Sequence, residues 1–464
     1  MSYKYDFIVI GSGPGGHQAA VTAANSGKKV AIIEKEREIG GACVHQGTIP
    51  SKTLRETALN LSRFMKSANG FDYSLKENVQ VESLMNRKVQ VRKAHVKYMQ
   101  NQLEDVDTFR GKASFVSEHE IKISGIRGEE EVISGEYIII ATGSRPRDPE
   151  NIPTDHEHIL DSDSILSMIY LPSSLAILGG GVIACEYATI FSILGVKATI
   201  IDTADRPLKF LDPQITDKFL ASFEDQGGVY MGEKNIKSVE WDGISEVVTI
   251  LESGEEIRTQ KMFVALGRLA NVEILQPEVV GIEMSSRKQI LVNEFYQTNK
   301  SHIYAVGDVI GFPALASTSM EQGRRAVCHA LNKDMGTQFE NVPMGIYTIP
   351  EISCIGLPES DAREKYGEGI YIGMAHFEEI ARGQISGIQD GLMKLVCAPD
   401  GETILGVHII GEGSTELIHV AQMAIVGGLK LETFIENVMN FPTLAEAYRV
   451  AAIDIKNQQK KRNK

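Results

Sequence analysis

A single local pattern occurs twice in this chain and limits the fold more than any other feature. The first copy follows the apolar run at 5–10 and reads Gly11-Ser12-Gly13-Pro14-Gly15-Gly16. The second follows the apolar run at 175–178 and reads Gly179-Gly180-Gly181-Val182-Ile183-Ala184. A hydrophobic strand, a turn with this glycine spacing and a helix form the phosphate-binding start of a βαβ unit. Two copies therefore predict an α/β chain with two doubly wound dinucleotide-binding domains.

Each position in the two turns has a physical role that predicts a contact with a bound dinucleotide. The first glycine permits the tight turn, and the second lets the pyrophosphate approach the backbone. The small third residue lets the helix pack closely against the strand. The residues predicted for these roles are Gly11, Gly13, Gly16, Gly179, Gly181 and Ala184.

An acidic residue ends the strand predicted after each turn. Glu34 and Asp202 hold these positions, about 20 residues after their turns. A carboxylate there accepts hydrogen bonds from a ribose and repels a 2′-phosphate, so Asp202 favours NAD(H) over NADP(H) at the second site. Arg206 and Lys209 follow closely and could offset that repulsion. They could equally be ordinary surface cations, and both interpretations remain open.

Bulk composition excludes several classes of protein. The net charge of −14 argues against nucleic acid as a partner, and no apolar run approaches the roughly 20 residues that span a bilayer. The first predicted strand begins at Tyr5, which leaves no room for a signal peptide, so we expect a cytoplasmic protein. The five cysteines are scattered without metal-ligand spacing, and we predict no metal site.

The segment at 40–52, GGACVHQGTIPSK, resembles the redox segment of the flavoprotein disulfide reductases, the family of lipoamide dehydrogenase and glutathione reductase. That segment normally has a second cysteine five residues after the first, whereas here Thr48 follows Cys43 at that spacing. A second departure lies near the C-terminus, where Phe441 stands in place of the family's catalytic histidine and Glu446 follows. Phenylalanine cannot transfer a proton, so the thiol chemistry of the family is predicted to be absent.

Other parts of the resemblance imply that flavin and nicotinamide sites remain. The segment at 298–309 is similar to the family's late flavin motif, which implies that Asp308, after Gly307, contacts the ribityl chain of FAD. Gly143 lies in a turn that the family places near the junction of the two nucleotide domains. The resemblance also implies an ion pair between Lys52 and Glu186 beside the flavin, where a cation stabilises the anionic reduced form.

The two departures together make the chain resemble one branch of this family, the soluble flavin-dependent pyridine nucleotide transhydrogenases. The resemblance implies bound FAD, with NAD(H) and NADP(H) as substrates of a ping-pong hydride transfer. It also implies a homodimer in which Phe441 and Glu446 reach the partner's site, and a non-essential Cys43 near the flavin. The implied domains are an FAD domain in two parts, 1–150 and 273–340, an NAD(P) domain at 151–272, and an α+β dimerisation domain at 341–464.

Two other functions remain open on the sequence. The first is an NADH diaphorase or oxidase that passes electrons to a quinone or oxygen, with Cys43 cycling as a sulfenic acid. The second is a non-catalytic flavoprotein that signals redox state to a partner.

Overall fold

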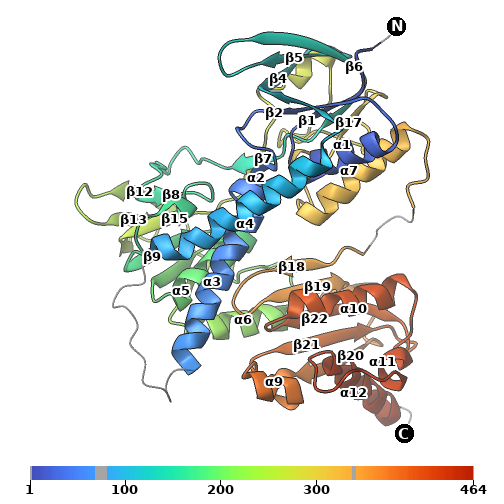
Figure 1. Ribbon diagram of the computed structural model, residues 1–464. Helices are drawn as coiled ribbons and strands as arrows, with labels where there is room; N and C mark the ends of the chain where they lie inside the picture. Colours follow the sequence, from blue (N-terminus) through green and yellow to red (C-terminus); the bar gives the residue numbers. More distant parts are fainter. Residues whose placement is uncertain (1–2, 68–80, 337–340, 463–464) are drawn as a thin grey trace.

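The computed structural model describes residues 3–67, 81–336 and 341–462. Figure 1 shows three units along the chain: an N-terminal unit that carries β1 and β2, a second built around β9, and a C-terminal unit that carries β18–β22. No helix in these described ranges is long and apolar enough to cross a membrane.

The first unit is built on a mixed sheet with helices against it, in which β3, β2, β1, β6 and β17 pair in parallel and β6, β5 and β4 pair antiparallel. Strand order is β3-β2-β1-β6-β5-β4, and β17 also pairs with β6, so a strand from residues 303–305 completes a sheet begun at residue 5. The strands alternate between two buried faces, since Phe7 and Val9 pack on one side and Ile8 and Ile10 on the other. The strands are β1 (Tyr5–Ile10), β2 (Val30–Glu34), β3 (Asp107–Arg110), β4 (Lys112–Ser117), β5 (Glu120–Ser124), β6 (Glu130–Ile140) and β17 (Ile303–Ala305).

In the described part of this unit, α-helices and short 3₁₀ turns accompany the sheet. Helices α1 and α7 pack together on one face, while α3 and α4 extend toward the second unit (Figure 1). The two helices α3 and α4 flank the segment 68–80, which lies outside the described residues. The elements are α1 (Pro14–Asn25), α2 (Gly41–His45), α3 (Thr48–Ser67), α4 (Val81–Gln102), α7 (Ala316–Ala330), η3 (Pro277–Val280) and η4 (Gly307–Ile310).

The second unit repeats the same architecture with a five-stranded parallel sheet in the order β11-β10-β9-β15-β8. Helix α5 follows the second glycine turn, and its residues from Ala184 to Ser192 are all buried, which explains its apolar sequence. The elements are β8 (Ile159–Leu160), η2 (Ile165–Ser167), β9 (Ser174–Leu178), α5 (Val182–Ile193), β10 (Lys197–Ile201), α6 (Pro213–Asp225), β11 (Val229–Met231) and β15 (Lys261–Val264).

Two small sheets complete the nucleotide units. An antiparallel sheet covers the second unit, and a two-stranded ribbon of β7 and β16 links the first unit to the second. These strands are β12 (Ile236–Trp241), β13 (Val247–Leu251), β14 (Glu256–Thr259), β7 (Ser144–Pro146) and β16 (Arg268–Ala270).

The C-terminal unit is an antiparallel sheet in the order β18-β19-β22-β21-β20 with helices on it, an α+β arrangement. The predicted domain boundaries at 150, 272 and 340 remain predictions. The elements are β18 (Met344–Ile346), β19 (Ile352–Gly356), α8 (Glu359–Tyr366), β20 (Tyr371–His376), η5 (Phe377–Glu379), α9 (Ala381–Ser386), β21 (Leu392–Cys397), β22 (Ile404–Ile410), α10 (Ser414–Val426), α11 (Glu432–Glu436) and α12 (Glu446–Arg462).

Candidate active site

The first glycine turn has the geometry of a phosphate-binding turn. Gly11 has a φ of +100°, and a Cβ at Gly16 would lie 1.9 Å from the Gly11 carbonyl oxygen, so only glycine fits there. A Cβ at Gly13, which caps α1, would meet nothing within 4 Å, so this residue faces open space. Gly16 therefore serves packing within the protein, whereas Gly13 leaves room for a ligand at the helix N-terminus.

Glu34 lies directly beside this turn. Its Oε2 accepts hydrogen bonds from the Ser12 N–H at 3.0 Å and from the Ser12 hydroxyl at 2.5 Å. Its Oε1 accepts from the Glu36 N–H at 2.9 Å. The carboxylate is buried and held rigidly at the end of β2, where it can accept from a ribose hydroxyl at the mouth of the turn.

A cleft of about 1270 Å³ runs from this turn between the three units. Its lining includes Glu34, Cys43, Lys52, Val182 and Asp308, which are far apart in the sequence. The volume exceeds the roughly 300–1,000 Å³ of small-molecule pockets and suits an extended dinucleotide.

Two buried polar atoms in the cleft wall test whether such a ligand fits. The hydroxyls of Thr142 and Tyr187 line the cleft and have no hydrogen-bond partner among the described residues. Buried polar groups are nearly always satisfied, so a polar ligand in the cleft would complete both. Together with the turn at Gly11–Gly16, these orphaned groups fit FAD.

Cys43 lies in α2, and Thr48, at the start of α3, occupies the position of a disulfide partner. All five cysteines lie in the described ranges and are free thiols. Burial raises the pKa of the Cys43 thiol, and a hydrogen bond with Thr48 and the charge of Lys52 offset this shift only in part. The thiol is thus held protonated at neutral pH, which is the unreactive form.

Lys52 and Glu186 form an ion pair across 134 residues of sequence. The Lys52 Nζ lies 2.6 Å from Oε2 of Glu186, whose side chain is only 6% exposed. The second oxygen, Oε1, accepts from the Tyr347 N–H at 2.9 Å, and the Lys52 ammonium also lies 5.0 Å from the centre of the Tyr347 ring. The implied ion pair is present, and a third residue from the C-terminal unit holds it.

A second network holds Asp308 in the lining of the cleft. The Ser144 hydroxyl donates to Oδ2 of Asp308 at 2.7 Å, and Arg268 donates from Nε to the Ser144 oxygen at 2.8 Å. Gly143 and Gly307 both have positive φ, +68° and +78°, in the turns that carry these side chains. Asp308 is therefore oriented with one oxygen committed to protein and the other left for a ligand.

The second glycine turn resembles the first in its backbone. Gly179 has a φ of +100°, and a Cβ at Gly181, the cap of α5, would meet nothing within 4 Å. Ala184 is fully buried where the helix meets the sheet. Asp202 accepts from the Thr203 N–H at 2.8 Å, and its Oδ2 would lie 2.2 Å from a Cβ at Gly180, so the carboxylate faces the turn.

The two cations that follow Asp202 have acidic partners of their own. Arg206 lies 3.7 Å from Asp217 on α6, and Lys209 lies 3.1 Å from Asp205. Both pairs are substantially exposed, and such pairs contribute only about 0–1 kcal/mol. The structure thus pairs neither cation with Asp202, although either pair can be exchanged for another anion at little cost.

Phe441 and Glu446 lie in the C-terminal unit. Phe441 is 68% exposed, and Oε2 of Glu446 is buried with no hydrogen-bond partner among the described residues. Other large apolar side chains of this unit are also exposed, among them Met423, Val426 and Val438. Met423 and Val426 lie on α10, and Val438 lies between α11 and α12.

Several residues that hold the site were missed on the sequence. Ser144, Arg268, Tyr347 and Gln322, whose Oε1 accepts from the Gly307 N–H at 2.8 Å, carry no motif. Their contacts span long stretches of sequence, such as the 164 residues between Ser144 and Asp308. No local signal could have identified them.

Comparison with known proteins gives consistent results. A model described as "Pyridine nucleotide-disulphide oxidoreductase" matches residues 5–323, and one for the dimerisation domain of the same proteins matches 342–452. The chain is 40% identical to a "Soluble pyridine nucleotide transhydrogenase" from Mycobacterium bovis, over 99% of each chain. It is also 40% identical, over 98% of each chain, to a protein of that name from Escherichia coli.

Two solved structures illustrate the similarity of the fold. The "HOCl-induced flavoprotein disulfide reductase RclA" of Escherichia coli matches with a TM-score of 0.88 and 26% identity, over 97% of this chain and 99% of that one. LpdA from Mycobacterium tuberculosis matches with a TM-score of 0.89 and 25% identity, over 96% and 99%. These matches confirm the predicted fold class and the family's use of FAD and nicotinamide nucleotides. The chain belongs to the pyridine nucleotide-disulphide oxidoreductases.

Proposed function

We propose that this protein transfers hydride between NADP(H) and NAD(H), as the names of its 40% identical relatives indicate for those proteins. One observation carries the proposal. The cleft retains the Lys52–Glu186 pair, while the neighbouring Cys43 faces Thr48 and has a thiol held protonated by burial, which raises its pKa. The residues proposed to support hydride exchange between flavin and nicotinamide are therefore present, whereas the second cysteine needed for disulfide reduction is replaced by Thr48.

The chain's own residues bind, orient and hold charge in this reaction. Bound FAD supplies the centre that accepts a hydride from one nicotinamide and returns it to another. The turn at Gly11–Gly16, Glu34 and Asp308 would hold that group, and Lys52 would place a positive charge beside it. Glu186 keeps Lys52 in place, and Cys43 takes no part.

The two nucleotides would use one site in succession, at the turn from Gly179 to Ala184. The first nucleotide must leave before the second binds, which predicts ping-pong kinetics. Asp202 suits the adenosine ribose of NAD(H), and we propose that Arg206 leaves Asp217 to contact the 2′-phosphate of NADP(H).

The decisive test is NADPH with thio-NAD⁺ as the only acceptor, followed anaerobically at the thionicotinamide absorbance. Parallel lines in a double-reciprocal plot are expected. If NADH reduces the flavin and NADPH does not, hydride transfer between NADP(H) and NAD(H) is excluded. An NADH diaphorase would then be the better description, and Asp202 is the observation that favours it.

We also propose a homodimer in which Phe441 and Glu446 approach the partner's cleft. The match to a dimerisation domain and the exposed Phe441, Met423 and Val426 support this assembly. Sedimentation at assay concentration should give a dimer, and a fully active monomer would contradict the proposal.

A further inference from the structure

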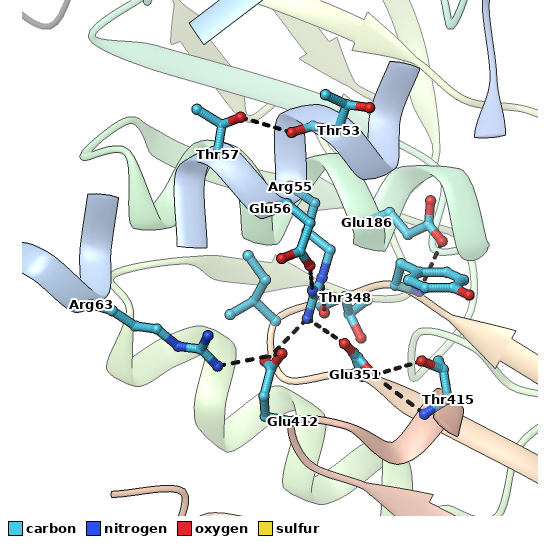
Figure 2. Close-up of polar contacts among 12 residues, drawn as sticks. Thr53, Arg55, Glu56, Thr57, Arg63, Glu186, Thr348, Glu351, Glu412 and Thr415 are labelled. Carbon is cyan, nitrogen blue, oxygen red and sulfur yellow. Dashed lines mark hydrogen bonds and ion pairs between the residues drawn. The ribbon is translucent and has the colours of Figure 1, made fainter. Parts of the chain in front are cut away.

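Arg55 is a fully buried cation that the proposed reaction does not use. It lies on α3, one turn beyond Lys52, and its side chain is only 1% exposed. Its guanidinium lies 3.2 Å from Glu351, 3.3 Å from Glu412 and 2.7 Å from Glu56. Figure 2 draws these contacts as dashed lines. A charge so completely removed from water is expensive unless each N–H group is satisfied, so this arrangement requires an explanation.

The three carboxylates around Arg55 lie within 4.8 Å of one another, a spacing that could suit a metal ion. The guanidinium of Arg55 already contacts all three, and Arg63 contacts Glu412 at 3.4 Å from the other side (Figure 2). Arg55 and Arg63 therefore already supply the positive charges that these carboxylates require. The role of the cluster follows from the segments of the chain that it joins.

The cluster joins α3 to the C-terminal unit at two places. Glu351 accepts from the hydroxyl of Thr415 at 2.8 Å and from its N–H at 3.3 Å, which ties the cluster to the first turn of α10 (Figure 2). The Arg55 Nε–H donates to the Thr348 carbonyl at 3.1 Å. Arg55 thus fixes both the start of α10 and the backbone segment between β18 and β19.

That backbone segment is the one that holds the Lys52–Glu186 pair. Tyr347 N–H donates to Glu186 at 2.9 Å, Thr348 carbonyl accepts from Arg55, and Ile349 N–H donates to the Thr189 hydroxyl at 3.1 Å. Three consecutive residues are therefore tied alternately to α5 and α3. A shift at Thr348 would move the Tyr347 N–H, and with it the carboxylate of Glu186.

We propose that Arg55 is a positioning residue for the flavin site, which holds Lys52 in place through Thr348, Tyr347 and Glu186. The inference rests on the proposed role of Lys52 and deepens it. The C-terminal unit is then part of the redox site of its own chain, because its backbone N–H fixes one oxygen of Glu186 and Lys52 binds the other.

The midpoint potential of the bound flavin tests this directly. A cation close to the flavin favours the anionic reduced form, so displacement of Lys52 should lower the potential. Arg55→Lys keeps the buried positive charge but loses the Nε–H that contacts Thr348. We expect it to disfavour reduction by about tenfold, which is about 30 mV for a two-electron couple. The titration uses dithionite and a reference dye without nicotinamide nucleotide, so its result is independent of transhydrogenation.

Lys394, on β21 of the C-terminal unit, provides a control, because it is another buried cation that links this unit to a second one. It is also buried, at 2% exposure, and links β21 to Asp212 at the cap of α6 at 2.8 Å. Lys394→Met should reduce thermal stability and leave the flavin potential unchanged. Arg55 is proposed to affect the flavin only by positioning Lys52. Arg55→Lys should therefore cause no further change in the flavin midpoint potential when Lys52 is already replaced by Met.

Three results would overturn the proposal. They are a wild-type potential in Arg55→Lys, an equal shift in Lys394→Met, and full additivity of the Arg55 and Lys52 substitutions. If Arg55→Lys does not fold, Glu351→Gln keeps the side-chain shape and weakens its contact with Arg55. It should lower the potential in the same direction, and a wild-type value there would equally refute the proposal.

Discussion

The preference between NADPH and NADH depends on whether Arg206 can leave Asp217 and contact the 2′-phosphate of NADPH. The contribution of Arg206 to NADPH affinity can be estimated from the structure. Arg206 is 31% exposed and lies 3.7 Å from Asp217, which is 64% exposed. A hydrogen bond from a charged group to a phosphate contributes about 1.5–3 kcal/mol. Loss of the exposed ion pair subtracts about 0–1 kcal/mol. The net gain for NADPH is then roughly 0.5–3 kcal/mol, and the middle of that range, about 1–2 kcal/mol, corresponds to about 5–30-fold in affinity.

Arg206→Ala should therefore raise the KM for NADPH by about 5–30-fold and change the KM for NADH less than about twofold. Asp217→Asn should act in the opposite direction, because it releases Arg206 from a competing carboxylate. A reduction of up to about fivefold in the KM for NADPH is expected. Steady-state reduction of a dye acceptor by each nucleotide measures both effects.

Arg258→Ala is a suitable control, since this arginine is also exposed and paired with Glu256 and Glu246 on the same unit. It should leave both KM values unchanged. Asp202→Ala should shift preference toward NADPH by removing a like charge near the 2′-phosphate. An equal effect of Arg206→Ala on both nucleotides, or a higher KM for NADPH in Asp217→Asn, would refute the reasoning.

Four further predictions concern the cleft and the buried cluster. Cys43→Ser should retain most nucleotide turnover, and anaerobic titration with NADH should take up two electrons; uptake of four would show that the thiol takes part. Because burial raises the Cys43 pKa, its alkylation by iodoacetamide should be slow at pH 7 and accelerate only in alkaline solution. Gly16→Ala should destabilise the protein by about 1–3 kcal/mol because its Cβ meets the Gly11 carbonyl, whereas Gly13→Ala should fold normally and bind FAD weakly; equal melting temperatures for the two variants would argue against these roles. Burial raises the pKa of Glu412, so the folded protein keeps this proton to higher pH than the unfolded chain, and the stabilisation present below the ordinary glutamate pKa is lost as pH rises through the folded value. Glu412→Gln cannot ionise, so its melting temperature relative to wild type should rise as the pH increases above the ordinary glutamate pKa of about 4.3, and a difference independent of pH would contradict the shift.

Local patterns were sufficient for the two nucleotide turns. The positive φ of Gly11 and the close packing of Gly16 on the Gly11 carbonyl depend on residues within a few positions, and Gly13 faces open space. Such features follow from backbone geometry and side-chain size alone, so the sequence predicts them with their roles. The roles proposed for Cys43, Thr48 and Phe441 also rest on the sequence, through resemblance to a family and the side-chain chemistry that each substitution removes.

The residues that hold the site residues in position could be identified only from the tertiary structure. Arg55 contacts a carbonyl 293 residues away, and Tyr347 holds Glu186 from 161 residues away. On the sequence, Arg55 is one more cation on an amphipathic helix, and Tyr347 is an unremarkable residue beside a strand. The cations after Asp202 show the same limit, since their acidic partners became visible only once α6 was in place. Backbone turns are determined by near neighbours, whereas the position of a buried charge depends on which distant groups the fold brings to it.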